Sequence, residues 1–89
     1  MSNCSEHKKE VLGESDMKVI AAAICDLHYE SLPELFEELR LKFIADGKKD
    51  YDMGHFSLNA YLNWIAADMA GAKIRAELFW QISKPFMET

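Results

Sequence analysis

The chain has 89 residues, enough for one small domain and no more. It carries 15 acidic and 10 basic residues, a net charge of −5, which argues against a general nucleic-acid-binding protein, since such proteins collect phosphates with a basic patch. The acidic surface keeps a small protein soluble, and it also permits a basic protein partner.

The sequence predicts neither a membrane segment nor a disulfide framework. Its longest nearly uncharged run, residues 56–67, is too short to cross a bilayer, and residues 1–14 are too polar for a secretory signal. Two cysteines, Cys4 and Cys25, do not make the framework of a small secreted scaffold. We therefore expect a cytoplasmic protein with reduced thiols.

Residues 1–14 are of mixed charge and predict a partly ordered arm, and residues 15–89 predict a single helical domain. The first helix is expected over residues 15–29, capped by Ser15 or Asp16, because apolar side chains recur there at helical spacing. The recurring residues are Met17, Ile20, Ile24 and Leu27.

A second helix is expected over residues 31–46, packed against the first in a tight hairpin or corner. The run Ser31-Leu32-Pro33-Glu34 matches a capping box, in which the serine hydroxyl and the glutamate carboxylate satisfy free amides reciprocally. Gly47 is expected to end this helix by turning left-handed. The ten residues 47–56 are then expected to form the connection to the next helix.

The third helix is expected from Ser57 to about Ser83, and it carries two apolar stripes on opposite faces. One has the character of a normal core stripe. Its members are Leu58, Tyr61, Leu62, Ile65, Met69, Ala72, Ala76, Phe79 and Trp80. The other has spacings close to a coiled-coil contact line. Its members are Ala60, Trp64, Ala67, Gly71, Ile74, Leu78 and Ile82, and we call this set the second stripe.

A helix that is apolar on two faces must be covered on both, and three arrangements satisfy that requirement. The two shorter helices can sandwich it within one chain. Alternatively, the second stripe contacts a second copy of the chain or another protein. In a two-fold homodimer the second stripes of the two copies cover each other. A break near Ala70-Gly71 would instead give two shorter helices and a four-helix domain. We predict the homodimer, with the second stripe as the self or partner interface.

Two Cys-x-x-His pairs invite a test for metal binding: Cys4 with His7, and Cys25 with His28. Two such pairs contain the four ligands of a tetrahedral zinc site. However, the second pair falls inside a helix, where a hydrogen-bonded structural histidine is more common than a ligand. We therefore predict no metal and no cofactor.

Catalysis is equally poorly supported by the sequence. Asp26 points to a different helix face from Cys25 and His28, so these residues do not form a nucleophilic site. His55 with Asp52 is better explained as a solvated loop pair, and no phosphate-binding glycine motif is present. We expect the protein not to be an enzyme.

The sequence thus predicts an all-α fold, a small three-helix or four-helix domain with a long C-terminal helix that packs as a homodimer. Its predicted function is that of a protein-interaction module: a small acidic regulator, inhibitor or adaptor that docks on a larger protein. Glu34, Glu37 and Glu38 form a candidate electrostatic docking face toward a basic partner. The alternative is a small helical DNA-binding transcriptional regulator, for which no basic recognition helix is visible.

Overall fold

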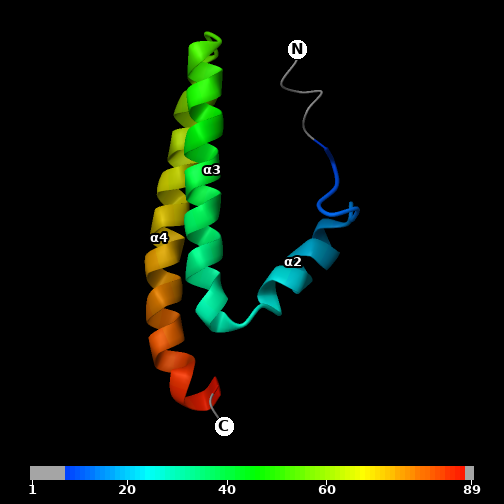
Figure 1. The fold of residues 1–89 in the computed structure, drawn as a ribbon, viewed down its shortest axis with the longest axis vertical. Helices are drawn as coiled ribbons and strands as arrows, with labels where there is room; N and C mark the ends of the chain where they lie inside the picture. Colours follow the sequence, from blue (N-terminus) through cyan, green and yellow to red (C-terminus); the bar gives the residue numbers. More distant parts are fainter. Residues whose placement is uncertain (1–7, 88–89) are drawn as a thin grey trace.

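A computed structural model describes residues 8–87 of the chain. Within that range it forms three α-helices and no strand, which confirms the all-α class (Figure 1). These are α2 (Met17–Cys25), α3 (Leu32–Asp52) and α4 (Phe56–Met87), with a short 3₁₀ turn, η1 (Tyr29–Ser31), between the first two. The radius of gyration is 15.7 Å, larger than the roughly 12 Å of a compact domain of this length. The molecule is therefore elongated.

Helices α3 and α4 lie side by side and antiparallel, and their hairpin is the body of the molecule (Figure 1). At 1.5 Å per residue, the 21 residues of α3 extend about 31 Å and the 32 residues of α4 about 48 Å. No break occurs at Gly71, so the four-helix alternative is wrong. Because α4 is longer, its C-terminal part extends beyond the start of α3.

The predicted ten-residue connection is wrong, because α3 continues through Gly47 to Asp52. Gly47 is buried against α4, and a Cβ atom built on it would lie 3.1 Å from the Asn59 Oδ1 atom. The glycine thus permits a close approach of two helices rather than a turn. The turn belongs to Gly54, whose φ of +84° is the left-handed conformation that glycine adopts readily.

The core between α3 and α4 is thin. Among the described residues only two apolar side chains are buried, Ala66 and Ala76, and no large side chain is fully buried. Asp50 of α3 and Ser83 of α4 are buried as well. A hairpin whose fully buried residues are small or polar, and whose large apolar residues are at most half-buried, gains less from the hydrophobic effect than a domain with a closed core, because the effect scales with the apolar area removed from water.

Helix α2 does not join that core, contrary to the expectation of a tight hairpin or corner. Its cap is the predicted one: the Asp16 carboxylate accepts a hydrogen bond from the Lys18 amide at 2.9 Å. The helix ends at Cys25, however, and it diverges from α3 without packing on either long helix (Figure 1). The chain reaches α3 through η1, with His28 in an extended conformation that prevents a continuous helix.

The 3₁₀ turn is held to the protruding part of α4 by two aromatic contacts. The ring centroids of His28 and Trp80 are 5.1 Å apart, and those of Tyr29 and Phe79 are 4.5 Å apart. Pairs at these distances contribute about 0.5–1.5 kcal/mol each beyond the area that they bury. The capping box is not formed, since Ser31 makes no side-chain capping bond at the start of α3.

Candidate interaction surface

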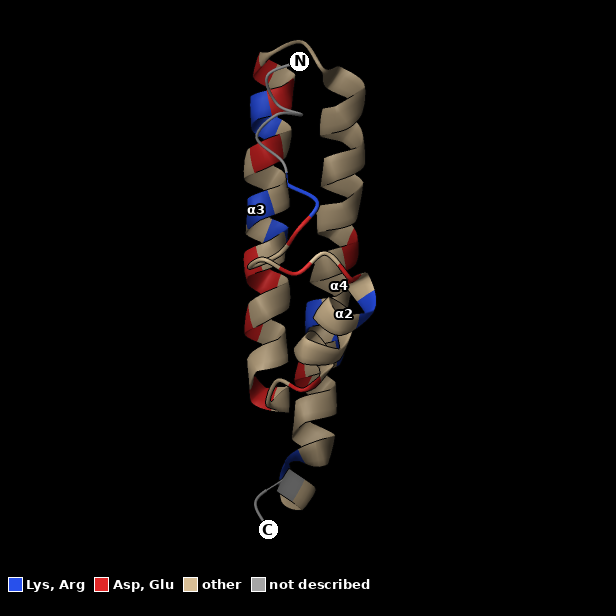
Figure 2. Cartoon of the chain, turned by 90° about the vertical axis from the view of Figure 1, so that its right-hand side faces the viewer, with Lys and Arg blue, Asp and Glu red and all other residues tan. Residues whose placement is uncertain are grey.

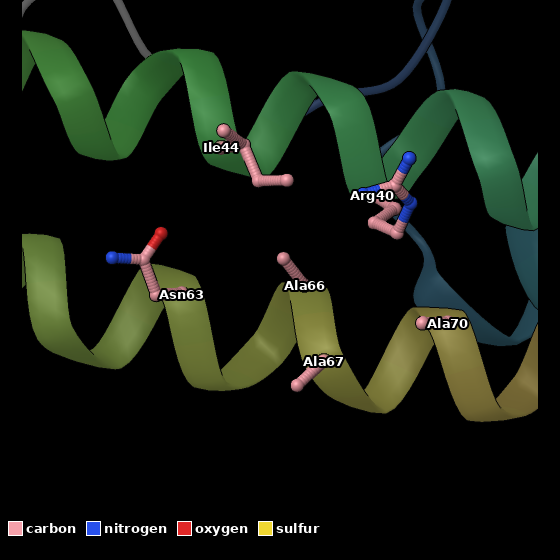
Figure 3. Close-up of a pocket in the computed structure, with 6 residues that line it drawn as sticks. All are labelled: Arg40, Ile44, Asn63, Ala66, Ala67 and Ala70. Atoms are coloured by element: carbon pink, nitrogen blue, oxygen red, sulfur yellow. The ribbon is translucent and has the colours of Figure 1, made fainter.

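The second stripe lies on the side of α4 that faces away from α3. Figure 3 shows Ala66 directed toward α3 and its neighbour Ala67 directed away from it. The large members of the stripe are open to solvent, with exposed fractions of 62% for Trp64, 58% for Ile74, 60% for Leu78 and 71% for Ile82. Gly71 is partly exposed, and Ala60 and Ala67 are exposed. The structure therefore brings the seven predicted residues together on one open helix face.

The stripe predicted to lie in the core is only partly covered. Leu62, Met69 and Trp80 are half-buried and Ala76 is buried, whereas several larger members remain exposed. The exposed members are Leu58, Tyr61, Ile65 and Phe79. The physical reason is that α3 packs on a narrower strip of α4 made of smaller residues. We call the exposed members of this stripe, together with the second stripe, the outer face of α4.

The sequence interpretation missed the place of Tyr61 and Phe79 on the outer face by assigning both to the core. Tyr61 and Trp64 form an edge-to-face ring pair with centroids 5.0 Å apart, so the two predicted stripes meet there. The spacing of three residues between Tyr61 and Trp64 could have indicated that Tyr61 lies beside the second stripe, because residues i and i+3 are neighbours on a helix.

Charge is distributed unevenly between the two long helices. Charged residues of both signs occur along the whole of α3, whereas α4 carries none from Phe56 to Ala67 (Figure 2). On α3 the charges are matched locally: Lys42 pairs with Asp46 at 2.6 Å, and Lys48 pairs with Asp52 at 3.3 Å. Exposed pairs of this kind contribute about 0.3–0.5 kcal/mol each, so their main consequence is a well-hydrated surface.

The predicted acidic docking face is divided by the structure. Glu34 and Glu38 are exposed, but Glu37 faces α4 and accepts two hydrogen bonds from Arg40, at 2.7 and 2.9 Å. Lys73 of α4 lies 3.7 Å from the same carboxylate. The Arg40 hydrogen bonds, assisted by Lys73, lower the pKa of Glu37 from 4.5 to about 2. Glu37 therefore bridges the two helices and has two cations of its own chain as partners.

The residues considered for metal binding or catalysis are separated or have structural contacts. His28 accepts a hydrogen bond from the Glu30 amide through Nδ1 at 3.1 Å and packs on Trp80. Cys25 is exposed, and Cys4 and His7 lie outside the described residues. Within residues 8–87 no group of three or more His, Cys, Asp or Glu side chains could hold a metal ion.

His55 does not lie against Asp52, whose carboxylate is paired with Lys48. Its Nδ1 atom is 3.6 Å from an Asp50 carboxylate oxygen, and its backbone amide donates to the Asp50 carbonyl at 2.7 Å. The latter bond closes the turn between α3 and α4. The histidine is therefore placed as part of that turn.

A depression between α3 and α4 holds about 230 Å³ and is open to solvent. It is lined by Arg40, Ile44, Asn63, Ala66, Ala67 and Ala70 (Figure 3). Small-molecule sites usually enclose roughly 300–1,000 Å³ and present several convergent polar groups. Here the guanidinium of Arg40 is already bound to Glu37. The outer face of α4 is therefore the better candidate site.

Comparisons of the chain with protein-family models, with curated proteins and with solved structures gave no match. Among the described helices, none combines the length and the apolar character needed to cross a membrane.

Proposed function

We propose that the chain is a non-catalytic protein-interaction module, a small acidic regulator, inhibitor or adaptor, and that the outer face of α4 is its working surface. The observation that carries this proposal is the exposure of the large members of the second stripe, Trp64, Ile74, Leu78 and Ile82. Three aromatic side chains of the outer face, Tyr61, Trp64 and Phe79, are between 45% and 62% exposed. At about 150–250 Å² per aromatic side chain, they alone leave roughly 350 Å² of apolar surface in water.

An apolar surface of this size is unusual on a soluble monomer. Soluble monomers rarely expose contiguous apolar patches beyond a few hundred Å², and larger ones mark surfaces that contact a protein, a membrane or a ligand. The aliphatic members of the outer face bring the total to on the order of 800 Å², which is the area that each partner contributes to a stable complex. Exposed aromatic side chains such as these are the usual energetic anchors of protein–protein interfaces.

The charges favour a protein partner over the alternative, a DNA-binding regulator. The net charge is −5, and the cations Arg40, Lys42, Lys48 and Lys73 each lie beside a carboxylate of their own chain. A phosphate would have to displace those carboxylates, which weakens binding to nucleic acid. The exposed carboxylates of Glu34 and Glu38 suit a partner with a basic surface. The proposed compartment is the cytoplasm, where the exposed Cys25 thiol stays reduced.

Site-specific photo-crosslinking in the cells that produce the protein tests this proposal. Benzoylphenylalanine placed at Leu78 is expected to form covalent adducts with polypeptide, whether that is a second copy or another protein. The matched control is Lys48, on the outer side of α3, whose side chain is 75% exposed and is expected to give no discrete adduct. Equal adducts at both positions, or none at Leu78, would refute the proposed role of the outer face.

A further inference from the structure

Two charged residues of α4, Asp68 and Arg75, lie among the apolar residues of the outer face at 100° per residue, and they are seven residues apart. Seven residues correspond to almost two helical turns, so the two side chains lie on the same side of the helix, about 10 Å apart along its axis. In the part of the chain that the structure describes, neither has a hydrogen bond or an ion pair. They interrupt an otherwise apolar face, and their charges are opposite.

The two charges and six of the large residues around them lie at matched distances on both sides of the midpoint between Gly71 and Ala72. Asp68 lies three and a half residues before that midpoint, and Arg75 the same distance after it. Aromatic and large aliphatic residues follow at matched distances on both sides. The matched pairs are Ile65 with Leu78, Trp64 with Phe79, and Tyr61 with Ile82.

We propose that a second copy of the chain covers this face, with the two α4 helices antiparallel and crossing at Gly71 and Ala72. In that arrangement Asp68 of each copy pairs with Arg75 of the other. The inference rests on the proposed function, whose working surface it shares, and it specifies the partner and the register of the contact.

Charge complementarity favours this register over its neighbours. A two-fold axis perpendicular to α4 at the midpoint places Asp68 of each copy beside Arg75 of the other, which gives two contacts between opposite charges. Sliding the helices by one heptad places Asp68 against Asp68 of the second copy, or Arg75 against Arg75. A parallel dimer in register makes both of those like-charge contacts. Like charges facing each other across an interface oppose association, so only the antiparallel register at the midpoint satisfies both residues.

Side-chain size supports the same arrangement. Helix axes approach to about 8 Å only where the contact residues are small, and Gly71 and Ala72 occupy the proposed crossing point. A Cβ atom at Gly71 would meet nothing within 4 Å except a terminal nitrogen of Arg75 at 3.6 Å, so no other described helix packs on this position. The larger side chains lie toward both ends of a contact from Tyr61 to Ile82, about 32 Å long.

The area is adequate for a stable dimer. The outer face offers on the order of 800 Å² from each copy, the typical contribution per partner of a specific complex. Because the contact is two-fold, each residue on the face contributes to it once from each copy. A partner of a different sequence would also need an acidic and a basic group at the matching spacing, which a second copy has by construction.

Solution mass and charge reversal test the proposal. Wild-type protein at 100 µM is expected to have twice the 10.2 kDa chain mass in sedimentation equilibrium. Asp68→Arg and Arg75→Asp each create two like-charge contacts, and each is expected to raise the dissociation constant at least about tenfold. The double variant Asp68→Arg/Arg75→Asp restores opposite charges and is expected to return to within about threefold of wild type. Circular dichroism confirms that each variant is helical.

Oxidative cross-linking tests the direction of the helices. In a Cys4→Ser/Cys25→Ser background, Gly71→Cys is expected to form a disulfide-linked dimer, since residues at the axis of an antiparallel pair approach within disulfide range. Ile82→Cys alone lies about 32 Å from its own copy and is expected to form none. A mixture of the Ile82→Cys and Tyr61→Cys proteins is expected to form a cross-linked heterodimer.

Three results would overturn the inference: a monomeric wild type, efficient cross-linking of Ile82→Cys with itself, or a double charge reversal no better than the single ones. A monomeric wild type whose Leu78 position cross-links to a different protein in cells would overturn the second copy as partner and support the proposed function. Absence of any adduct at Leu78 together with a monomeric protein would overturn both.

Discussion

The close approach of α3 and α4 at Gly47 gives the sharpest test of the fold. A Cβ atom at this position would lie 3.1 Å from the Asn59 Oδ1 atom and 3.5 Å from the Leu62 Cβ atom. The Asn59 side chain accepts only a long hydrogen bond, 3.3 Å from Asn63 Nδ2, so its amide can shift by a few tenths of an ångström. Gly47→Ala is therefore tolerated, and the gain in helix propensity of up to about 1 kcal/mol is partly lost to this shift.

Gly47→Leu has no such room, because three further carbon atoms must enter the space occupied by α4. Overpacking of a tight contact costs about 3 kcal/mol at its upper end, and the better helix propensity of leucine offsets roughly 1 kcal/mol of that cost. The net loss of about 2 kcal/mol corresponds to a melting temperature lower by about 8–16 °C for a domain of this size. Thermal melts followed by circular dichroism at 222 nm, at one fixed protein concentration, measure it.

The matched control is Ala45→Leu, at an exposed position of the same helix. Alanine and leucine have similar helix propensities, and the free energy of unfolding is expected to change by less than about 0.5 kcal/mol. If Gly47→Leu melts at or above the wild-type temperature while Ala45→Leu is neutral, the two helices do not approach at Gly47 and the register of the hairpin is wrong.

Three further predictions concern other contacts. Because the pKa of Glu37 is lowered, the contribution of its carboxylate to stability is complete above about pH 4.5 and is lost as the pH falls toward 2. Glu37→Gln is therefore expected to flatten the pH dependence of the urea midpoint in that range, and an unchanged slope would contradict this. Tyr29→Ala removes the ring contact with Phe79 and is expected to lower the free energy of unfolding by about 1 kcal/mol or more. It is also expected to speed amide hydrogen exchange in η1, and exchange rates equal to those of the wild type would refute this. Gly71→Glu places a carboxylate at the proposed dimer axis and is expected to give a folded monomer by light scattering, whereas an unchanged dimer mass would argue against the axis.

Caps and apolar periodicity predicted the helices well where only residues close in the sequence are involved. The Asp16 cap and the long helix beginning near Ser57 follow from hydrogen-bonding chemistry and periodicity, and both are present in the structure, with α4 starting one residue earlier. The end of α3 was predicted wrongly because Gly47 and Gly54 compete as stop signals. The i,i+4 pair of Lys48 with Asp52 was a signal for continuing the helix, and it is formed.

The direction in which α4 packs was not predictable from apolar periodicity. Periodicity gives weight to large side chains such as Tyr61 and Phe79, whereas α3 packs on Ala66, Ala76 and the buried Ser83. Small residues permit close approach, and Lys73 with Glu37 adds an ion pair between the helices. Neither effect appears as a hydrophobic stripe, so the contact strip shares Leu62, Met69 and Ala76 with the predicted core stripe but also includes Ala66, Lys73 and Ser83.

The thin core and the exposed outer face have one common physical cause. The most deeply buried residues of the hairpin are small or polar, and apart from the half-buried Leu62, Met69 and Trp80 the large apolar side chains of α4 are left to solvent. A chain of 89 residues has few apolar groups to spare, and leaving this many uncovered removes much of the free energy that usually offsets conformational entropy. In the proposed dimer, covering the outer face returns part of that free energy, so we expect the dimer to be more stable than the monomer. Charges on α3 keep the opposite side hydrated, so the proposed association is expected to use α4 and not α3.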